Sequence, residues 1–177
     1  MARTTEVGGH SPLVILARES IVAYVAERRV LETPADLPPM LQERAGAFVS
    51  LKRHGELRGC IGTIEPAYAT LADEIIQNAI AAATRDPRFM PVQPPEIQGL
   101  TISVDVLGAP ERVGGLEDFD PRRYGMIARA GGRRGLLLPD LEGVDTPEEQ
   151  LAIVCRKAGI TPEEAVEFCR FTVTRHH

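Results

Sequence analysis

The chain has 177 residues, 44% of them hydrophobic and 25% charged, which suits one globular domain or two joined subdomains with a buried core. Its net charge of −5 argues against general electrostatic attraction to nucleic acid or anionic membranes. No apolar run reaches the ~20 residues of a membrane-spanning helix, and the N-terminus lacks a secretory pattern. Three cysteines, an odd number without paired spacing, favour a reducing compartment, so we expect a cytoplasmic protein.

The first part of the chain predicts an arm, a helix and a connector. Residues 1–10 are expected to form a flexible arm. Ser11-Pro12 combines an N-cap residue with a first-turn proline, and apolar residues recur at helical spacing to about Val30. Three prolines lie between Leu31 and Leu41, so this stretch is expected to be extended and not helical.

Residues 48–63 predict a β-hairpin with its turn near His54-Gly55. A two-residue turn would pair Arg53 with Glu56 and set Cys60 opposite Val49. A three-residue turn would set Cys60 opposite Ser50 and Arg58 opposite Lys52. We favour the second register, because it matches apolar residues on the two strands: Val49 and Leu51 with Leu57 and Ile61.

The second strand of this hairpin carries the most unusual chemistry. Because side chains alternate along a strand, Arg58, Cys60 and Gly62 are expected to share one face. Arg58 and Cys60 would lie roughly 6–7 Å apart, where the guanidinium can favour the thiolate form of the cysteine. Gly59 and Gly62 mark a bulge or a close approach to the backbone, and Gly62 is expected to leave open space as a pocket floor.

The remaining sequence alternates helix and strand signals without the spacing of parallel βαβ units. The expected elements are a helix over 70–84, a proline-rich crossing over 88–99, a strand over 100–107, a hairpin over 124–138 around Gly131-Gly132, a helix opened by the capping box Thr146–Glu149, and a strand over 166–173. This order predicts an α+β fold, a mostly antiparallel sheet with flanking helices, divided into two tightly joined subdomains.

Arg85, Asp86 and Arg88 follow the helix predicted over 70–84. They could supply anion-binding guanidiniums and a carboxylate to a cleft. Equally, they could form a helix stop in which Asp86 caps backbone groups and pairs with an arginine. The sequence leaves both interpretations open.

Other chemistry has less support. Cys155 and Cys169 lie on apolar faces and are expected to be packing residues, and His54 is expected to be a solvated turn residue. No Cys-x-x-Cys, three-cysteine cluster motif or nucleotide-binding fingerprint occurs, so no metal, iron–sulfur cluster or other cofactor is expected. The terminal pair His176-His177 is left out of the site.

The run Leu57–Gly62 (Leu-Arg-Gly-Cys-Ile-Gly) resembles the signature hexapeptide of the AMMECR-type domain family, whose bacterial and archaeal members are called AmmeMemoRadiSam system protein A. The resemblance continues through Ala79–Val92 and Arg133–Pro139, and it covers residues 11–175 as a single domain. It implies the family's fold and an association with Memo-type and radical-SAM proteins, but no particular reaction.

Two hypotheses follow. In the first, the chain is an enzyme with Cys60 as thiolate nucleophile and Arg58 as its electrostatic partner; Gly59, Gly62, Arg85, Asp86 and Arg88 would bind a small metabolite or a nucleobase. In the second, the chain is a non-catalytic binding or adaptor domain that uses the same arginines to hold a protein or an RNA.

Overall fold

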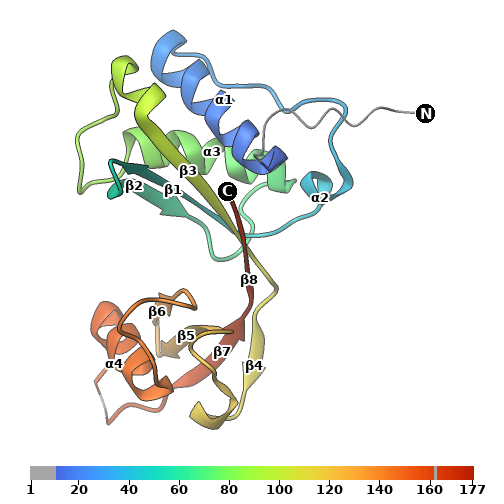
Figure 1. Cartoon of the computed structure of the whole chain (residues 1–177). Coiled ribbons are helices and arrows are strands. Elements are labelled where there is room, and N and C mark those ends of the chain that lie inside the picture. Colours follow the sequence, from blue (N-terminus) through green and yellow to red (C-terminus); the bar gives the residue numbers. More distant parts are fainter. Residues whose placement is uncertain (1–10, 162) are drawn as a thin grey trace. The chain divides into compact units, whose positions relative to one another are not determined.

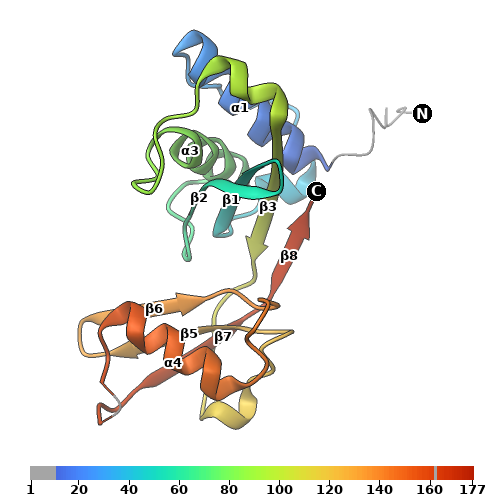
Figure 2. The ribbon, with the colours of Figure 1, turned by 60° about the vertical axis from the view of Figure 1, so that its left-hand side comes forward.

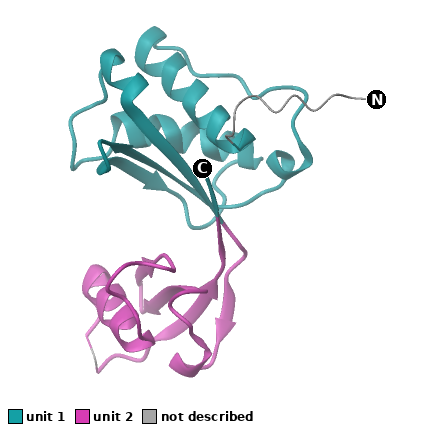
Figure 3. Ribbon diagram, viewed as in Figure 1, with its two compact units in different colours: residues 1–106, 175–177 teal, residues 107–174 magenta. Residues whose placement is uncertain are grey.

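The computed structural model describes residues 11–161 and 163–177, so the arm predicted over residues 1–10 lies outside the described residues. The chain divides into two units, one formed by residues 1–106 with 175–177 and the other by residues 107–174 (Figure 3). Each unit combines helix with a four-stranded, mainly antiparallel sheet, which confirms the predicted α+β class. Among the described residues, none of the helices has both the length and the apolar character that a bilayer crossing requires.

In unit 1 the sheet has the strand order β2-β1-β3-β8, and helices α1 and α3 lie on one of its faces (Figure 1). Along β1, Ala47, Val49 and Leu51 point to this face and are fully buried against the helices. The elements are α1 (Pro12–Glu27), α2 (Pro39–Gln42), β1 (Ala47–Arg53), β2 (Glu56–Gly62), α3 (Leu71–Thr84), a 3₁₀ turn η1 (Pro94–Gly99), β3 (Leu100–Leu107) and β8 (Val173–His176).

Local signals place most of these boundaries. The Ser11 hydroxyl accepts a hydrogen bond from the Leu13 N–H, as expected of an N-cap, and α1 ends at Glu27 because Arg28 adopts a left-handed conformation. The predicted extended connector is wrong at its end, where α2 begins. Its first residue is Pro39, and proline is tolerated at that position because its missing N–H would have no helical partner.

Unit 2 has the strand order β4-β7-β5-β6, and α4 packs on its sheet (Figure 2). The predicted capping box is confirmed, since Thr146 and Glu149 each accept a backbone hydrogen bond from the other residue. The strand predicted over 166–173 stops at Phe171, and the next residues form the separate strand β8. The elements of unit 2 are β4 (Glu111–Val113), η2 (Leu116–Asp118), β5 (Gly125–Ala130), β6 (Arg133–Leu137), α4 (Pro147–Ala158) and β7 (Glu167–Phe171).

The two units have the same topology. Each consists of a hairpin (β1-β2 or β5-β6), a helix (α3 or α4), and a strand (β3 or β7) beside the first strand of the hairpin. The fourth strand of each sheet departs from the chain order: β4 follows β3 but joins the second sheet, and β8 follows β7 but joins the first. The architecture is therefore an internal repeat with exchanged outer strands.

Details of packing repeat as well. A Cβ on Gly59 would lie 2.2 Å from the Ala82 carbonyl oxygen of α3, and one on Gly135 would lie 2.4 Å from the Val154 carbonyl oxygen of α4. Glycine thus lets each helix approach the second strand of its hairpin. The fourth residue of each helix, Glu74 or Gln150, is a fully buried polar side chain. The Arg-Gly pairs 58–59 and 134–135 are the visible trace of this repeat in the sequence.

Candidate functional site

The β1-β2 hairpin has a two-residue turn. Arg53 pairs with Glu56, and both His54 and Gly55 have positive φ angles (53° and 82°), the conformation that a tight twisted hairpin requires. The preferred three-residue turn is therefore wrong, but its main consequence is confirmed: Cys60 lies opposite Ser50.

A β-bulge reconciles these two results. Between Leu51 and Lys52 the register shifts by one residue, because Arg58 is an extra residue without a partner on β1. Arg58 is thus not opposite Lys52, as we predicted; Leu57 is. The bulge also moves Leu57 to the outer side of the hairpin, where it is 41% exposed, instead of matching it with Leu51 in the core.

The two glycines beside Cys60 do not enclose an empty space. Gly59 faces α3, where the Ala82 carbonyl fills the position a side chain would need. On Gly62, a Cβ would lie 2.2 Å from Cγ of Phe48, which is directly opposite on β1. The expected pocket floor at Gly62 is therefore wrong, because the Phe48 ring covers this glycine.

Cys60 lies half-buried on the face of the sheet opposite to the helices. Its Sγ is 3.2 Å from the Ser50 hydroxyl oxygen, within hydrogen-bonding distance for sulfur. Ser103 on β3 is the next residue across the sheet, so a thiol and two hydroxyls form one row over three strands.

Asp86 and Arg88 close the edge of β2 at Cys60. The Asp86 carboxylate accepts the Cys60 backbone N–H at 2.9 Å, and the Arg88 guanidinium donates to the Cys60 carbonyl at 3.3 Å. These are the backbone groups that a further strand would bind. The two side chains replace that strand and protect the edge from pairing with another chain.

The pair is held together strongly. Arg88 donates to both oxygens of Asp86, at 3.0 Å from Nε and 2.7 Å from Nη2, and Asp86 is almost fully buried. These bonds hold the pKa of Asp86 far below its usual range in spite of the burial, with the Arg88 side chain as the largest cause. They also raise the pKa of Arg88, to which the Cys60 sulfur makes a smaller contribution.

Arg58 is directed to Glu96 of η1. Its Nε and Nη2 donate to the two carboxylate oxygens at 3.0 and 3.1 Å, and its Nη1 donates to the Met90 carbonyl at 2.9 Å. Arg53 shares the same carboxylate at 3.1 Å. These arginines, Arg58 first, lower the pKa of Glu96. The positive charge of Arg58 is thus balanced by Glu96. Its guanidinium, bonded to Glu96 and to the Met90 carbonyl, also fixes the loop that follows α3.

Replacing Arg58 with lysine should therefore destabilise unit 1. An ammonium cannot form the paired bonds to Glu96 and also reach the Met90 carbonyl, so we expect a loss of about 1–2 kcal/mol in the free energy of unfolding. Urea denaturation measures it. The matched control is Arg53→Lys: Arg53 binds the same carboxylate but is more exposed, so its loss should stay below about 0.5 kcal/mol. Equal losses for the two variants would contradict this role of Arg58.

The structure thus brings Arg58, Gly59, Cys60, Asp86 and Arg88 into one connected assembly, in which Gly62 is covered. Arg85 does not join it: it follows α3 as an exposed residue, and only its backbone N–H is fixed, by Ala81. The assembly matches the helix-stop interpretation of residues 85–88 more closely than an open cleft. Sequence reasoning missed Glu96 and Met90, although a glutamate after Pro94-Pro95 is a signal for a capped turn.

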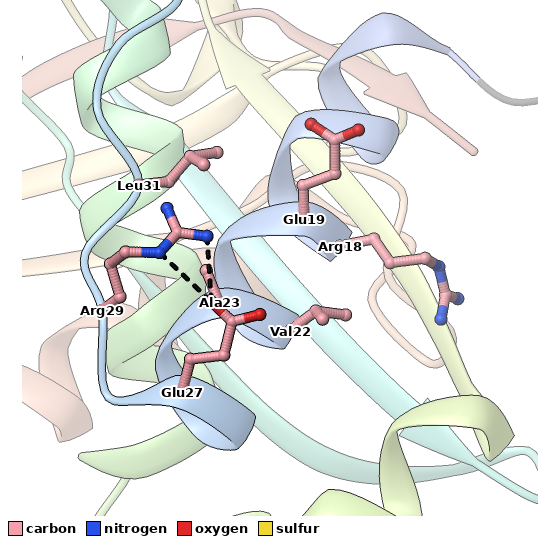
Figure 4. Close-up of a pocket in the computed structure, with 7 residues that line it drawn as sticks. All are labelled: Arg18, Glu19, Val22, Ala23, Glu27, Arg29 and Leu31. Atoms are coloured by element: carbon pink, nitrogen blue, oxygen red, sulfur yellow. Dashed lines mark hydrogen bonds and ion pairs between the residues drawn. The ribbon is translucent and has the colours of Figure 1, made fainter.

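Neither Cys155 nor the pocket along α1 provides a second candidate site in the part of the chain that the structure describes. Cys155 is partly buried, and burial raises the pKa of its thiol. Within residues 11–161 and 163–177, no three His, Cys, Asp or Glu side chains are grouped so as to hold a metal ion. A pocket of about 400 Å³ lies along α1, where Glu27 and Arg29 pair with each other, and contains none of the predicted site residues (Figure 4).

Comparison with known proteins agrees with this architecture. The AMMECR1 family matches residues 14–176. A Thermotoga maritima protein is 52% identical over 171 residues, with 95% of this chain and 98% of that protein aligned. A Clostridium acetobutylicum protein, CA_C1420, is 47% identical over 93% of this chain, but the match spans only 36% of that longer protein. The crystal structure of the uncharacterised protein PH0010 from Pyrococcus horikoshii superposes with a TM-score of 0.84 at 38% identity, covering 92% of this chain and 88% of that one. The chain therefore belongs to the AMMECR1 family.

Proposed function

We propose that unit 1 contains a cysteine-centred site, in which the Cys60 sulfur adds to an unsaturated, electrophilic carbon of a small metabolite or nucleobase. The S–C bond forms as the π bond at that carbon opens, and the substrate takes up the proton that the thiol releases. The observation that carries this proposal is the setting of Cys60. Its sulfur is half-buried on the polar sheet face, 3.2 Å from the Ser50 hydroxyl, while Asp86 and Arg88 fix its backbone on both sides. A nucleophile held this rigidly loses little entropy when it meets its substrate.

The arginines of this site have roles that differ from those predicted from the sequence. Arg88 donates to the Cys60 carbonyl and therefore helps to position the residue that carries the sulfur, while Arg58 makes no contact with Cys60. Arg58 becomes a positioning residue that fixes the loop carrying Arg88. Arg85 is exposed and could bind an anionic group of the substrate. The Memo-type and radical-SAM partners that the family resemblance implies, and the cytoplasmic location expected from the cysteine content, belong to the same proposal.

Alkylation tests the proposal. At pH 7, iodoacetamide should modify Cys60 about tenfold faster than Cys155, whose partly buried thiol has a raised pKa. Mass spectrometry of the digested protein measures both rates in one sample. Ser50→Ala should slow the reaction at Cys60 and leave Cys155 unchanged. Equal alkylation rates for Cys60 and Cys155 would exclude Cys60 as an activated nucleophile.

The second candidate is a binding module without chemistry of its own, and the ion pairs favour it. Arg58 and Arg88 are each paired with a carboxylate and each donate to a backbone carbonyl. They therefore make this surface rigid, as a binding module requires. The longer Clostridium relative carries the same domain as one part of its chain, as expected for a module that works beside another domain. In this case Arg58→Ala should abolish co-purification of the protein or RNA partner from the native host, while Cys60→Ala has no effect. The opposite pattern would exclude the module.

A further inference from the structure

The loop after α3 presents one side chain with unusual exposure. Met90 is 81% exposed, more than any other large hydrophobic residue among those the structure describes. Its neighbour Val92, two residues on, is buried, and Phe89 is half-buried. Met90 therefore offers an apolar side chain whose full burial by a partner would contribute about 1.5–3 kcal/mol.

The backbone that carries Met90 is fixed on both sides. The Arg58 guanidinium holds its carbonyl at 2.9 Å, the Phe89 N–H donates to the Asp86 carbonyl at 3.1 Å, and the Val92 N–H donates to the Ala83 carbonyl of α3 at 2.8 Å. The exposure of Met90 is therefore built into the loop and is not a consequence of a loose segment. The fixed backbone keeps Met90 at the surface, while its side chain retains the rotamer freedom of an exposed methionine.

The charges around Met90 are arranged asymmetrically. Arg88 is 55% exposed and its partner Asp86 only 2%; Arg53 is 42% exposed and its partner Glu96 only 15%. Asp86 and Glu96 are thus more buried than Arg88 and Arg53, whereas Arg58, at 17% exposure, is about as buried as Glu96. In a chain of net charge −5, an incoming partner meets arginine around a central methionine. Methionine and arginine are both enriched in protein–protein interfaces.

We propose that Arg53, Arg58, Arg88, Phe89 and Met90, here called the Met90 surface, dock a protein partner with an apolar pocket for Met90 and an acidic rim. Protein is favoured over RNA because Met90, the most exposed of these side chains, has no ring on which a base could stack, and the one ring of the surface, Phe89, is half-buried. The chain as a whole is also acidic. The Cys60 thiol is not part of this surface, so docking stands whether or not Cys60 reacts.

Site-specific photo-crosslinking in the native host tests this surface. A photoreactive amino acid is placed at position 90 and, as the matched control, at position 40, since Met40 is also an exposed methionine at 44%. Position 90 should give a crosslink to an acidic segment of one other protein, identified by mass spectrometry, and position 40 should not. A crosslink to RNA, to a second copy of this chain, or equally from both positions would overturn the proposal.

The identified protein is then purified and its affinity measured by calorimetry. Met90→Glu should weaken binding about tenfold or more, and Met40→Glu should leave it unchanged. Affinity should also fall as salt concentration rises, because the acidic rim meets exposed arginines. Cys60→Ser should bind like the unchanged chain, which separates failure of docking from failure of the cysteine site. Tight binding by Met90→Glu would show that the surface is elsewhere.

Discussion

Replacing Gly59 with alanine is expected to lower the free energy of unfolding of unit 1 by roughly 3 kcal/mol, the upper end of the usual cost of overpacking. The added Cβ would lie 2.2 Å from the Ala82 carbonyl oxygen, which belongs to a helix backbone and cannot rotate away. To accommodate this Cβ, either β2 must move away from α3 or the bulge in β2 must rearrange. Hydrogen exchange measures this loss for each unit separately, from the slowest-exchanging amides of β2 and α3.

The internal repeat supplies matched controls for this variant. Gly135→Ala should have a similar effect on unit 2, because its Cβ would lie 2.4 Å from the Val154 carbonyl oxygen. Gly132→Ala should be nearly neutral, since no atom lies within 4 Å of that position and its φ angle is not positive. A neutral Gly59→Ala would show that the strand and the helix do not need this close approach.

Sequence signals predicted the elements that depend on nearby residues. The N-cap at Ser11, the capping box at Thr146 and the turn glycine at position 55 each act within a few residues. The strand glycines predicted a bulge or a close approach to the backbone, and both occur around Gly59, but the exact place of the bulge, Arg58, could not be predicted from nearby residues. It depends on which residues of β2 face α3, and hence on a contact between Gly59 and a carbonyl 23 positions further along the chain. An arginine at position 58 does not by itself require a bulge.

The site was predicted as a set of residues but not as an arrangement. Gly62 was expected to leave open space, whereas the Phe48 ring covers it; the close approach expected of the strand glycines is confirmed at Gly59, which lies against α3. Two arginines suggested free positive charge, whereas both are paired with carboxylates, and Glu96 was not foreseen as one of these. Composition alone cannot tell an open pocket from a tight contact, because glycine permits both.

The repeat gives a reason to separate packing from chemistry in the β2 strand. At the equivalent place in unit 2, Arg134-Gly135 is followed by Leu136, whose carbonyl accepts a hydrogen bond from Lys157 of α4. An aliphatic side chain therefore suffices for the fold at that position, and a covered edge carbonyl occurs in both units. Cys60 therefore differs from its counterpart Leu136 in chemistry, just as the unpaired Arg58 differs from the regularly paired Arg134 in geometry.

Asp86→Asn is expected to cost unit 1 about 2–3 kcal/mol at pH 7, because the amide cannot accept bonds from Arg88 and from the Cys60 N–H as the carboxylate does. The effect should depend on pH. Since the pKa of Asp86 is lowered in the folded state, the unfolded chain binds the proton more tightly, and stability falls as the pH drops through the unfolded value of about 3.9.

Urea denaturation at several pH values between about 7 and 3 measures both effects. In the unchanged chain, the contribution of Asp86 is complete above its unfolded pKa of about 3.9 and decreases progressively as acid is added. In Asp86→Asn this part of the pH dependence should be missing, so the two stability curves converge at low pH. The control is Asp36→Asn, an exposed aspartate of the proline-rich connector, which should follow the unchanged chain throughout. Parallel curves for Asp86→Asn and the unchanged chain would mean that the carboxylate charge does not hold the β2 edge, and that the closure around Cys60 depends on shape alone.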